Sequence, residues 1–227
     1  MDIVINALIP NFDRASAEFY RSIMQTLQMV LFSGSLSFVF GVILGVLLVV
    51  MRKGGILQNV VLYSILDKII NIVRSIPFLI LIILLMPLSR HIMGTAIGVV
   101  GAIVPLVVGT VPFFARQVET AVSEIDKGLI EASISMGLSP LKIIWRVYLR
   151  ESIPSLVRVT QITAINLVGL ATLAGAVGAG GLGDFAIRFG HQQRLTDLMW
   201  LTIVVILIIV SVIQMLGNVI IKRTKRT

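Results

Sequence analysis

Residues 131–154 read EASISMGLSPLKIIWRVYLRESIP, a polar and charged stretch that stands between long apolar runs. The whole chain has 227 residues, of which 57% are hydrophobic and only 13% are charged. Its apolar residues come in continuous runs rather than in alternation with polar ones. The composition and the long apolar runs therefore predict an all-α polytopic membrane protein. The polar stretch between them predicts one helical hairpin outside the bilayer.

The ends of the two hairpin helices can be predicted from their capping residues. Ser123, with Asp126 three residues later, is typical of a capping-box start, and Gly137 suits the position just after a helix end. Ser139 and Pro140 then predict a second start, as N-cap and first helical residue. The hairpin is thus expected to be two short helices joined at Gly137.

The second hairpin helix is predicted to be amphipathic and basic. Its apolar residues share one face at helical spacing: Leu141, Ile144, Trp145 and Tyr148. Its cations follow another face at steps of four: Lys142, Arg146 and Arg150. Two interpretations compete, namely a helix that lies on anionic lipid, which composition alone favours, and a docking element for a soluble partner.

Five apolar runs are long enough for membrane helices, which need about 20 residues each. They lie near Thr26–Val50, Lys68–Leu88, Gly94–Ala115, Val159–Val177 and Leu198–Ile221. The second run must reach back past Arg74 towards Lys68, because Ile76–Leu88 alone is too short. Residues 1–22 carry acidic residues and no signal-peptide pattern, and are expected to form a short external amphipathic segment.

The distribution of Lys and Arg predicts the orientation of these spans. One side collects most of the cations: Arg52, Lys53, Arg116, Lys127, Lys142, Arg146, Arg150, Arg158, Lys222, Arg223, Lys225 and Arg226. The other side holds fewer: Arg14, Arg21, Arg90, Arg188 and Arg194. The hairpin and the C-terminus are therefore expected in the cytoplasm, and the N-terminus outside, for a protein of the bacterial cytoplasmic membrane.

Several function classes are disfavoured by what the sequence carries. The net charge of +8 suits positive-inside anchoring, so a nucleic-acid partner is not expected. There is no cysteine and no phosphate-binding loop, so we expect no catalytic, cofactor or metal site and no ATP site on this chain. The spans carry almost no mid-membrane charge, which argues against a proton-driven carrier.

Gly178, Gly180 and Gly183 satisfy G-x-G-x-x-G, a spacing that binds dinucleotides only after a buried strand. No such strand is expected here. A glycine-rich stretch at the end of a membrane helix more often permits close helix approach or a turn at the external surface. A loop that flexes when a receptor docks remains an alternative interpretation.

The hairpin resembles the EAA loop of ABC-importer permeases. The matching residues are Glu131, Ala132, Ser133, Gly137, Val147 and Leu149. The similarity to the methionine-type subgroup extends to four further places: Arg74–Phe78, Pro105, Pro112 with Phe113, and Gly175–Gly183. The chain departs from the usual pattern at Ser133, where the family has alanine, and at Arg150, where it has proline; Pro154 supplies a helix break slightly later.

This resemblance implies a type I ABC-importer permease fold, with five transmembrane helices in a single domain over residues 1–227 and a cytoplasmic coupling segment over 119–154. It implies an ATP-driven importer subunit for methionine, D- and L-, that is not itself an enzyme. The implied partners are an ABC ATPase that binds ATP and Mg, an extracytoplasmic substrate-binding (lipo)protein, a second copy of the chain and the lipid bilayer. The alternatives are a permease of the same architecture for another small solute, a secondary carrier or channel, and, with least support, a membrane enzyme or assembly factor.

Two sets of site residues follow. The resemblance assigns ATPase coupling to Glu131, Ala132, Ser133, Gly137 and Leu138. The fourth span offers polar candidates for a translocation pathway: Thr163, Asn166 and Thr172. For these three, interhelical hydrogen bonding, pore lining, or both remain open, with interhelical packing slightly favoured.

Overall fold

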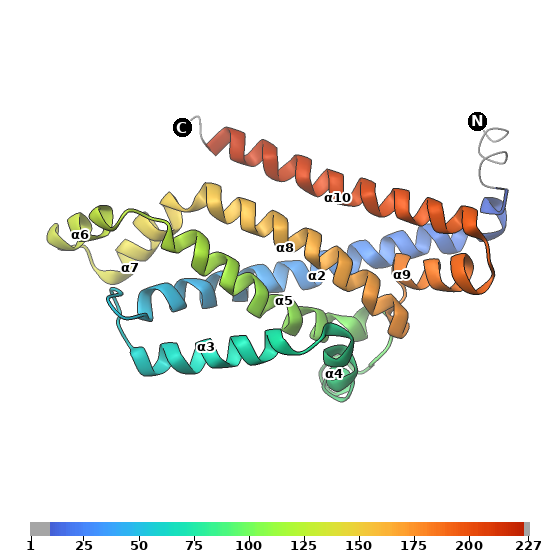
Figure 1. The fold of residues 1–227 in the computed structure, drawn as a ribbon, viewed down its shortest axis with the longest axis horizontal. Coiled ribbons are helices and arrows are strands. Elements are labelled where there is room, and N and C mark those ends of the chain that lie inside the picture. The colour runs from blue at the N-terminus through green and yellow to red at the C-terminus, as the bar shows by residue number, and fades with distance from the viewer. Residues whose placement is uncertain (1–9, 225–227) are drawn as a thin grey trace. The chain divides into compact units, whose positions relative to one another are not determined.

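A computed structural model describes residues 10–224 of the chain, which are almost entirely helical and contain no β-strand (Figure 1). The long helices are α2 (Phe12–Met51), α5 (Gly98–Ser123), α8 (Ile153–Ala174) and α10 (Thr196–Thr224). The shorter elements are α3 (Val60–Ser75), α4 (Phe78–Met93), α6 (Lys127–Ser135), α7 (Pro140–Ile143), η1 (Ile144–Leu149), η2 (Gly175–Ala179), α9 (Gly181–Phe185) and η3 (Ala186–Gln192), where η marks a π-helix.

The chain divides into two compact units, each built from three separate stretches of sequence. Unit 1 consists of Met1–Ser35, Pro77–Val107 and Ala164–Gln214. Unit 2 consists of Leu36–Ile76, Val108–Thr163 and Met215–Thr227. No single cut in the sequence separates them, because each unit takes part of α2, of α5 and of α8.

Helix α2 is longer than the sequence predicted. Its 40 residues extend about 60 Å at 1.5 Å per residue, about twice the thickness of a bilayer's hydrocarbon core. No helix end separates the predicted external segment 1–22 from the span predicted from Thr26, because the helix runs from Phe12 through both. No glycine or proline lies between Phe12 and Ser33 to end it. Residues 1–9 of the predicted segment lie outside the described residues.

Small residues form the buried stripe of α2. Spaced four or seven apart, they are Ser22, Thr26, Ser33, Ser37, Gly41 and Gly45. A Cβ at Gly41 would clash with the Phe114 ring, and one at Gly45 would lie 2.5 Å from Cβ of Val118, both on α5. Small side chains at this spacing let helices approach closely, which is how membrane helices gain packing contacts.

The second predicted span is broken rather than continuous. α3 ends at Ser75 and α4 begins at Phe78, with Ile76 and Pro77 between them, so the prediction of one helix over Lys68–Leu88 is wrong. Ile76 is extended (φ −80°, ψ 123°), the conformation that a following proline favours. Four helices are long and apolar enough to span a membrane, and α3 with α4 would be the fifth as one broken span.

The other three predicted spans are confirmed with shifted ends. α5 and α10 extend beyond the predicted segments at their C-terminal ends, and α8 begins six residues before Val159. Gly94, the predicted start of the third span, instead follows α4 in the left-handed conformation, with φ of 77°. It is a helix stop, which suits glycine because no Cβ opposes positive φ.

Each unit has its own apolar core. In unit 1, one cluster of buried side chains comes from α2, α4, α5, α8 and η2: Met29, Ile82, Ala102, Leu106, Leu167, Ala171, Ala174 and Ala179. In unit 2, the largest cluster joins α2 and α5 to the hairpin and the start of α8: Val46, Val49, Val50, Phe114, Val118, Ala121, Val122, Ile143, Tyr148 and Val159. The hairpin is thus packed onto this core at Ile143 and Tyr148.

Candidate functional site

The hairpin, defined here as α6, α7 and η1 (residues 127–149), begins at Asp126 rather than at the predicted Ser123. The Asp126 carboxylate accepts a hydrogen bond from the Gly128 amide at 2.7 Å and caps α6. Ser123 is instead the last residue of α5, and its hydroxyl accepts a hydrogen bond from Nη1 of Arg52 at 2.9 Å. The predicted capping box at Ser123 is wrong because Ser123 still belongs to α5. The N-cap of the next helix is Asp126, three residues later.

The turn at Gly137 is confirmed in detail. α6 ends at Ser135 and Gly137 follows with φ of +74°. The Leu138 amide donates to the Ser133 carbonyl at 3.1 Å, and the Gly137 amide to the Ile134 carbonyl at 2.9 Å. These two bonds make a Schellman motif, which satisfies the last carbonyls of the helix. Glycine is required here by its positive φ rather than by space, since no heavy atom lies within 4 Å of a Cβ built on Gly137.

The second hairpin helix begins as predicted but exposes a different face. Ser139 is extended and Pro140 is the first residue of α7. From Ile144 the helix widens into the π-helix η1, which changes the register of the side chains. The predicted face is therefore divided: Tyr148 is buried, whereas Leu141 and Trp145 are 68% and 70% exposed. A break at Ser152, just before Pro154, then separates this segment from α8.

The five predicted coupling residues separate into an inward and an outward group. The Ser133 hydroxyl is buried and donates to the Leu129 carbonyl at 2.7 Å, while Leu138 packs against the unit 2 core. Glu131, Ala132 and Gly137 are exposed. The inward pair thus faces the protein interior and the outward three are accessible to a partner.

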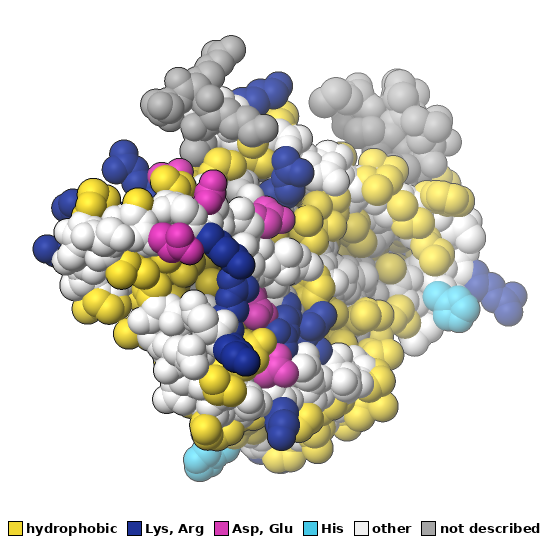
Figure 2. Space-filling model, turned by 60° about the vertical axis from the view of Figure 1, so that its left-hand side comes forward, with side chains coloured by type: hydrophobic (Ala, Val, Ile, Leu, Met, Phe, Trp, Pro, Cys, Tyr) yellow, Lys and Arg dark blue, Asp and Glu magenta, His cyan; other side chains and the backbone are white. Residues whose placement is uncertain are grey.

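Large apolar side chains are exposed on the same hairpin. They are Leu129, Ile134, Met136, Leu141 and Trp145. In Figure 2, which turns the end bearing α6 and α7 forward, basic and acidic side chains also gather on this face among hydrophobic ones. Exposed apolar residues rimmed by charge are typical of a protein or membrane interaction site.

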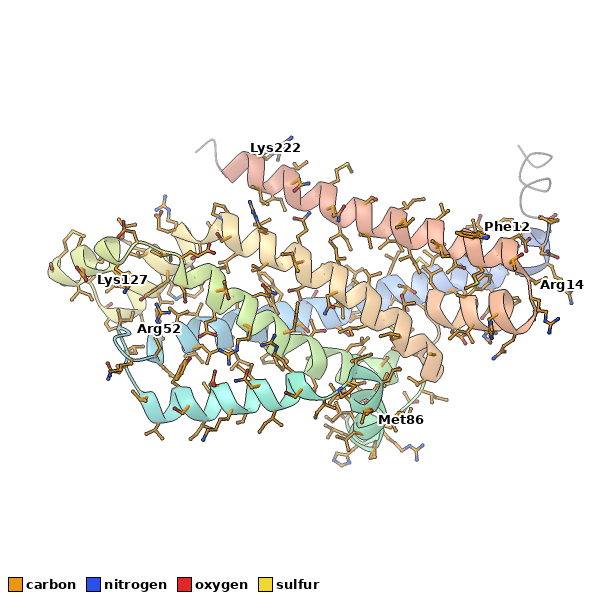
Figure 3. All side chains as sticks on the ribbon, viewed as in Figure 1. Phe12, Arg14, Arg52, Met86, Lys127 and Lys222 are labelled. Carbon is orange, nitrogen blue, oxygen red and sulfur yellow. The ribbon has the colours of Figure 1, made fainter. Side chains whose placement is uncertain are left out.

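A recess of about 660 Å³, which the sequence did not predict, lies beside the hairpin. Residues from the end of α2, its following loop, α5, α6 and η1 line it: Arg52, Lys53, Gly54, Gly55, Ile56, Ser123, Lys127, Ile130, Glu131, Ile134 and Tyr148. Figure 3 labels Arg52 and Lys127, which lie at the same end of unit 2. Burial raises the pKa of the Tyr148 hydroxyl, while the charge of Arg52 opposes that increase.

A polar cluster between α3 and α5 was also missed. Arg116 donates from Nη1 to Oε2 of Glu119 at 2.6 Å and from Nη2 to Oδ1 of Asn71 at 3.1 Å, and it forms a short ion pair with Asp67. The signal in the sequence is weak, because Arg116 lies 49 residues from Asp67. The spacing of Asp67 and Asn71 on one helix face was the only local indication.

The three pathway candidates on α8 do not share one face. At about 100° per residue, Thr163 and Asn166 lie about 60° apart, whereas Thr172 lies opposite Thr163. The threonine hydroxyls donate to carbonyls of their own helix, Thr163 to Val159 at 2.8 Å and Thr172 to Val168 at 2.9 Å. Asn166 is half-buried, and no residue among 10–224 makes a hydrogen bond with its amide.

Asn166 borders an exposed stripe of α8. The stripe residues recur at helical spacing: Ile162, Gly169, Leu173 and Ala176. A polar amide at the edge of such a stripe is rarely left facing lipid, because an unsatisfied amide costs free energy there. Of the three candidates, Asn166 alone therefore has a side chain available to a partner or solute.

The glycine-rich stretch makes a tight turn inside unit 1, which confirms close approach rather than a nucleotide site. Gly178, Gly180 and Gly181 all have positive φ. The amide of Gly181 donates to Oε1 of Gln25 at 2.8 Å, and that of Leu182 to the Thr26 hydroxyl at 2.8 Å. A Cβ at Gly183 would overlap the Thr172 carbonyl. The glycines thus allow α9 to pack against α2 and α8.

No group of three potential ligands among His, Cys, Asp and Glu is placed to hold a metal within residues 10–224.

Comparison with known proteins agrees with this arrangement. Residues 37–226 match the family model described as "Binding-protein-dependent transport system inner membrane component". A probable D-methionine transport system permease protein MetI from Vibrio cholerae is 43% identical over 88% of each chain. The D-methionine transport system permease protein MetI from Escherichia coli strain K12 is 50% identical, over 60% of this chain and 63% of that protein.

The fold matches a solved structure as well. A chain from the MetNI methionine ABC transporter in an inward-facing conformation superposes with a TM-score of 0.91 at 44% sequence identity. The match covers 93% of this chain and 98% of that one.

Proposed function

Because this chain belongs to the family of binding-protein-dependent transport system inner membrane components, we propose that it is the membrane subunit of an ATP-driven importer of methionine, both D- and L-. The family match spans residues 37–226. The proposed solute is supported by relatives named as D-methionine permeases at 43% and 50% identity and by the likeness to a methionine transporter chain. We interpret residues 1–227 as one permease domain, since both compact units draw on three separate stretches of sequence.

We propose that the hairpin couples the chain to a separate ATPase, which binds the ATP and Mg. The observation that carries this proposal is the set of large exposed apolar side chains on the hairpin, among which Leu141 and Trp145 lie on its second helix. Buried tryptophan anchors dominate many protein interfaces. Glu131, Ala132 and Gly137 lie on the accessible part of the hairpin, while Leu138 packs against the core and Ser133 is buried with its hydroxyl bonded inside α6.

The proposed mechanism follows from that packing. Ile143 and Tyr148 are buried in the same cluster as side chains of α2 and α5. Movement of the hairpin with its ATPase therefore displaces the ends of two spans, because packed cores shift as units rather than deform. Coupled closure of the ATPases would then open the helix bundle towards an extracytoplasmic binding protein.

The proposed pathway lies between two copies of the chain. Five helices of this size do not easily enclose a pathway alone, and α8 carries the exposed stripe that Asn166 borders. Asn166 supplies one donor and one acceptor to a zwitterionic solute. Thr163 and Thr172 are weaker candidates, since their hydroxyls are already bonded within α8.

The proposed orientation places the hairpin and the C-terminus in the cytoplasm and the N-terminus outside. It rests on the excess of Lys and Arg around the hairpin and the end of α10. Accessibility labelling of single cysteines introduced at Ser135 and at Gln193 tests it, because the chain has no cysteine of its own. Labelling of position 135 from outside intact cells would contradict the orientation.

Replacement of Trp145 tests the coupling proposal with a matched control. Trp145→Ala is expected to reduce retention of the co-expressed ATPase by at least about thirtyfold in affinity, as for an interface hot spot of roughly 2 kcal/mol. Trp200→Ala on α10 removes an equally exposed tryptophan, 68% against 70%, and is expected to retain the ATPase. Equal retention by both variants would contradict the proposal.

Uptake by the assembled transporter tests the solute. Labelled methionine is expected to enter vesicles only with ATP and the binding protein present, and both stereoisomers should compete. Uptake that persists without any ATPase subunit would instead indicate a secondary carrier. Competition by another small solute alone would indicate a permease of the same architecture with a different substrate.

A further inference from the structure

The recess beside the hairpin has the charge of an anion site. Arg52, Lys53 and Lys127 contribute three positive charges and Glu131 one negative charge, which leaves a formal charge of +2. Neither lysine forms an ion pair within the described residues, 10–224. Nη1 of Arg52 donates a hydrogen bond to Ser123, and the planar guanidinium has further N–H donors in a fixed arrangement. The cations are therefore available to an anion.

Tyr148 adds a free hydroxyl to the recess. The residue as a whole is only 3% exposed, and no hydrogen bond joins its hydroxyl to any residue among 10–224. The hydroxyl oxygen is not one of the fully buried unpaired atoms of the described residues, so it is accessible to a ligand in the recess. The Tyr148 hydroxyl lies near the positive charge of Arg52, which acts on its titration. Together they offer a donor pair to the same oxygen atom or group.

The position of the recess identifies the source of the anion. Candidate spans α2 and α5 end at Met51 and Ser123, and the recess is lined by residues 52–56 and by Ser123 itself. It therefore lies just beyond these two helix ends, on the side that carries most of the Lys and Arg, where anionic headgroups attract cations. Ile56, Ile130 and Ile134 add apolar lining beside the cations. Basic pockets at the ends of membrane helices are typical sites for anionic headgroups.

We propose that this recess binds the phosphate of an anionic phospholipid, with a glycerol headgroup of the phosphatidylglycerol type. Arg52, Lys53 and Lys127 bind the phosphate, and the Tyr148 hydroxyl donates to a phosphate oxygen. The Glu131 carboxylate accepts from a headgroup hydroxyl, which explains why one anion lines a basic recess. The volume of about 660 Å³ lies within the roughly 300–1,000 Å³ of ligand sites. This inference needs only the membrane placement of α2 and α5, and does not rest on the coupling proposal.

Lipid binding at this place would tie α6 and η1 to the loop that follows α2 and to the last residue of α5. The recess is lined by residues 52–56, by Ser123 and by both hairpin elements, so a bound headgroup bridges the hairpin to the ends of the spans that it packs against. The hairpin then holds one position when the lipid is bound and gains freedom when it is absent. The lipid composition of the membrane thus acts on the same segment that we propose to couple transport.

Titration of the delipidated full chain in neutral detergent with phosphatidylglycerol or phosphatidylcholine, followed by native mass spectrometry, tests this inference. We expect one phosphatidylglycerol per chain to bind tightly, and the triple variant Arg52→Gln, Lys53→Gln, Lys127→Gln to weaken that binding about a hundredfold, at roughly fivefold per cation. The matched control is Lys142→Gln, Arg146→Gln, Arg150→Gln, which removes the same charge from the hairpin outside the recess. It is expected to keep the binding, and equal losses in both triple variants would overturn the proposal.

Two milder variants protect the test against misfolding. Lys53→Gln with Lys127→Gln leaves the Arg52–Ser123 bond intact, and Tyr148→Phe removes a single hydroxyl. Both are expected to weaken phosphatidylglycerol binding while the thermal midpoint without lipid changes little. Unchanged lipid binding in both would overturn the proposal.

Two further arms separate other occupants. Inorganic phosphate is expected to compete weakly with the lipid; if phosphate binds as tightly as phosphatidylglycerol, the site takes a free anion and the lipid proposal fails. Retention of the co-expressed ATPase is measured in parallel. Recess variants that bind lipid normally but lose the ATPase would assign the recess to the protein interface and overturn the proposal, whereas lost lipid binding with the ATPase retained supports it.

Discussion

Arg52, one residue beyond the end of α2, donates a hydrogen bond from Nη1 to the hydroxyl of Ser123, the last residue of α5, at 2.9 Å. The two residues are 71 positions apart in the sequence. The bond joins the ends of two spans at the place where the hairpin begins. Both residues also line the recess, so the same contact shapes its wall.

Loss of this bond is expected to destabilise unit 2 modestly. Ser123→Ala should lower the free energy of unfolding by about 1–2 kcal/mol, since hydrogen bonds to charged groups contribute roughly 1.5–3 kcal/mol and this one is partly exposed. Thermal unfolding in detergent measures the change. Ser135→Ala on the exposed end of α6 is the control and should shift the midpoint by less than the error of the assay.

The Arg116 cluster makes a prediction about charge balance. Arg116→Met removes the cation that Asp67 and Glu119 share, so stability should fall by about 1–3 kcal/mol, although Asp67 keeps its hydrogen bond from Asn71. Adding Asp67→Asn removes one of the two uncompensated charges and is expected to recover part of the loss. A double variant no more stable than Arg116→Met would contradict the view that the uncompensated Asp67 charge contributes to the loss. The thermal midpoints of the three variants provide the comparison.

The effect of a substitution at Gly137 should depend on whether the new residue accepts positive φ rather than on its size. Its φ of +74° is tolerated by asparagine but opposed by a β-branched residue, while space is available for either side chain. We expect Gly137→Asn to retain most uptake, and Gly137→Val to lose most of it through a displaced hairpin. Membrane insertion, measured by the amount of protein in the membrane fraction, should be equal for both. If the two variants transport alike, the Schellman turn is not what positions the hairpin.

Two glycines of unit 1 are expected to respond in opposite ways to the same change. A Cβ at Gly183 would overlap the Thr172 carbonyl, whereas a Cβ at Gly169 meets no heavy atom within 4 Å. Gly183→Ala should therefore destabilise the protein by about 1–3 kcal/mol or more through overpacking. Gly169→Ala should be neutral or slightly stabilising, because alanine favours the helix. The fraction that remains monodisperse after heating in detergent distinguishes them.

The buried tyrosine predicts a pH dependence at the alkaline end. Burial raises the pKa of Tyr148 above its ordinary value of 10.0, so the folded state holds the phenolic proton more tightly than the unfolded state. The resulting stability is fully present below pH 10 and is lost as pH rises through the folded-state pKa. Tyr148→Phe cannot titrate and is expected to show a shallower decline there. Parallel alkaline unfolding curves for the two proteins would contradict this assignment.

Much of this architecture was accessible from hydropathy and capping residues. The apolar runs that form α5, α8 and α10 are long, so length and composition were enough to predict these helices. The hairpin could be predicted from Gly137 and Pro140, because each residue type favours a particular backbone conformation at a helix end. The break at Ile76 and Pro77 was missed because a proline in an apolar run indicates either a kink or a break. The extension of α2 to Phe12 was missed because polar residues were assumed to end the span.

The parts of the candidate site that escaped prediction depend on contacts distant in the sequence. The recess combines residues 52–56 with η1, almost 90 positions later, and no local pattern links them. The exposure of Trp145 and the burial of Tyr148 depend on the π-helix η1, and no sequence pattern predicted a π-helix there. The coupling residues were placed by motif, and the structure adds which of them face inward.

The small-residue stripe of α2 has a consequence for how this sequence can vary. At Gly41 and Gly45 the neighbouring α5 leaves no room for a Cβ, so substitutions there are limited by volume rather than by polarity. Exposed positions on the same helix, such as Phe32 and Val39, tolerate any apolar residue. In saturation mutagenesis along α2, the tolerance to substitution would therefore rise and fall with the helical repeat. The least tolerant positions would mark the contact with α5 more clearly than hydrophobicity does.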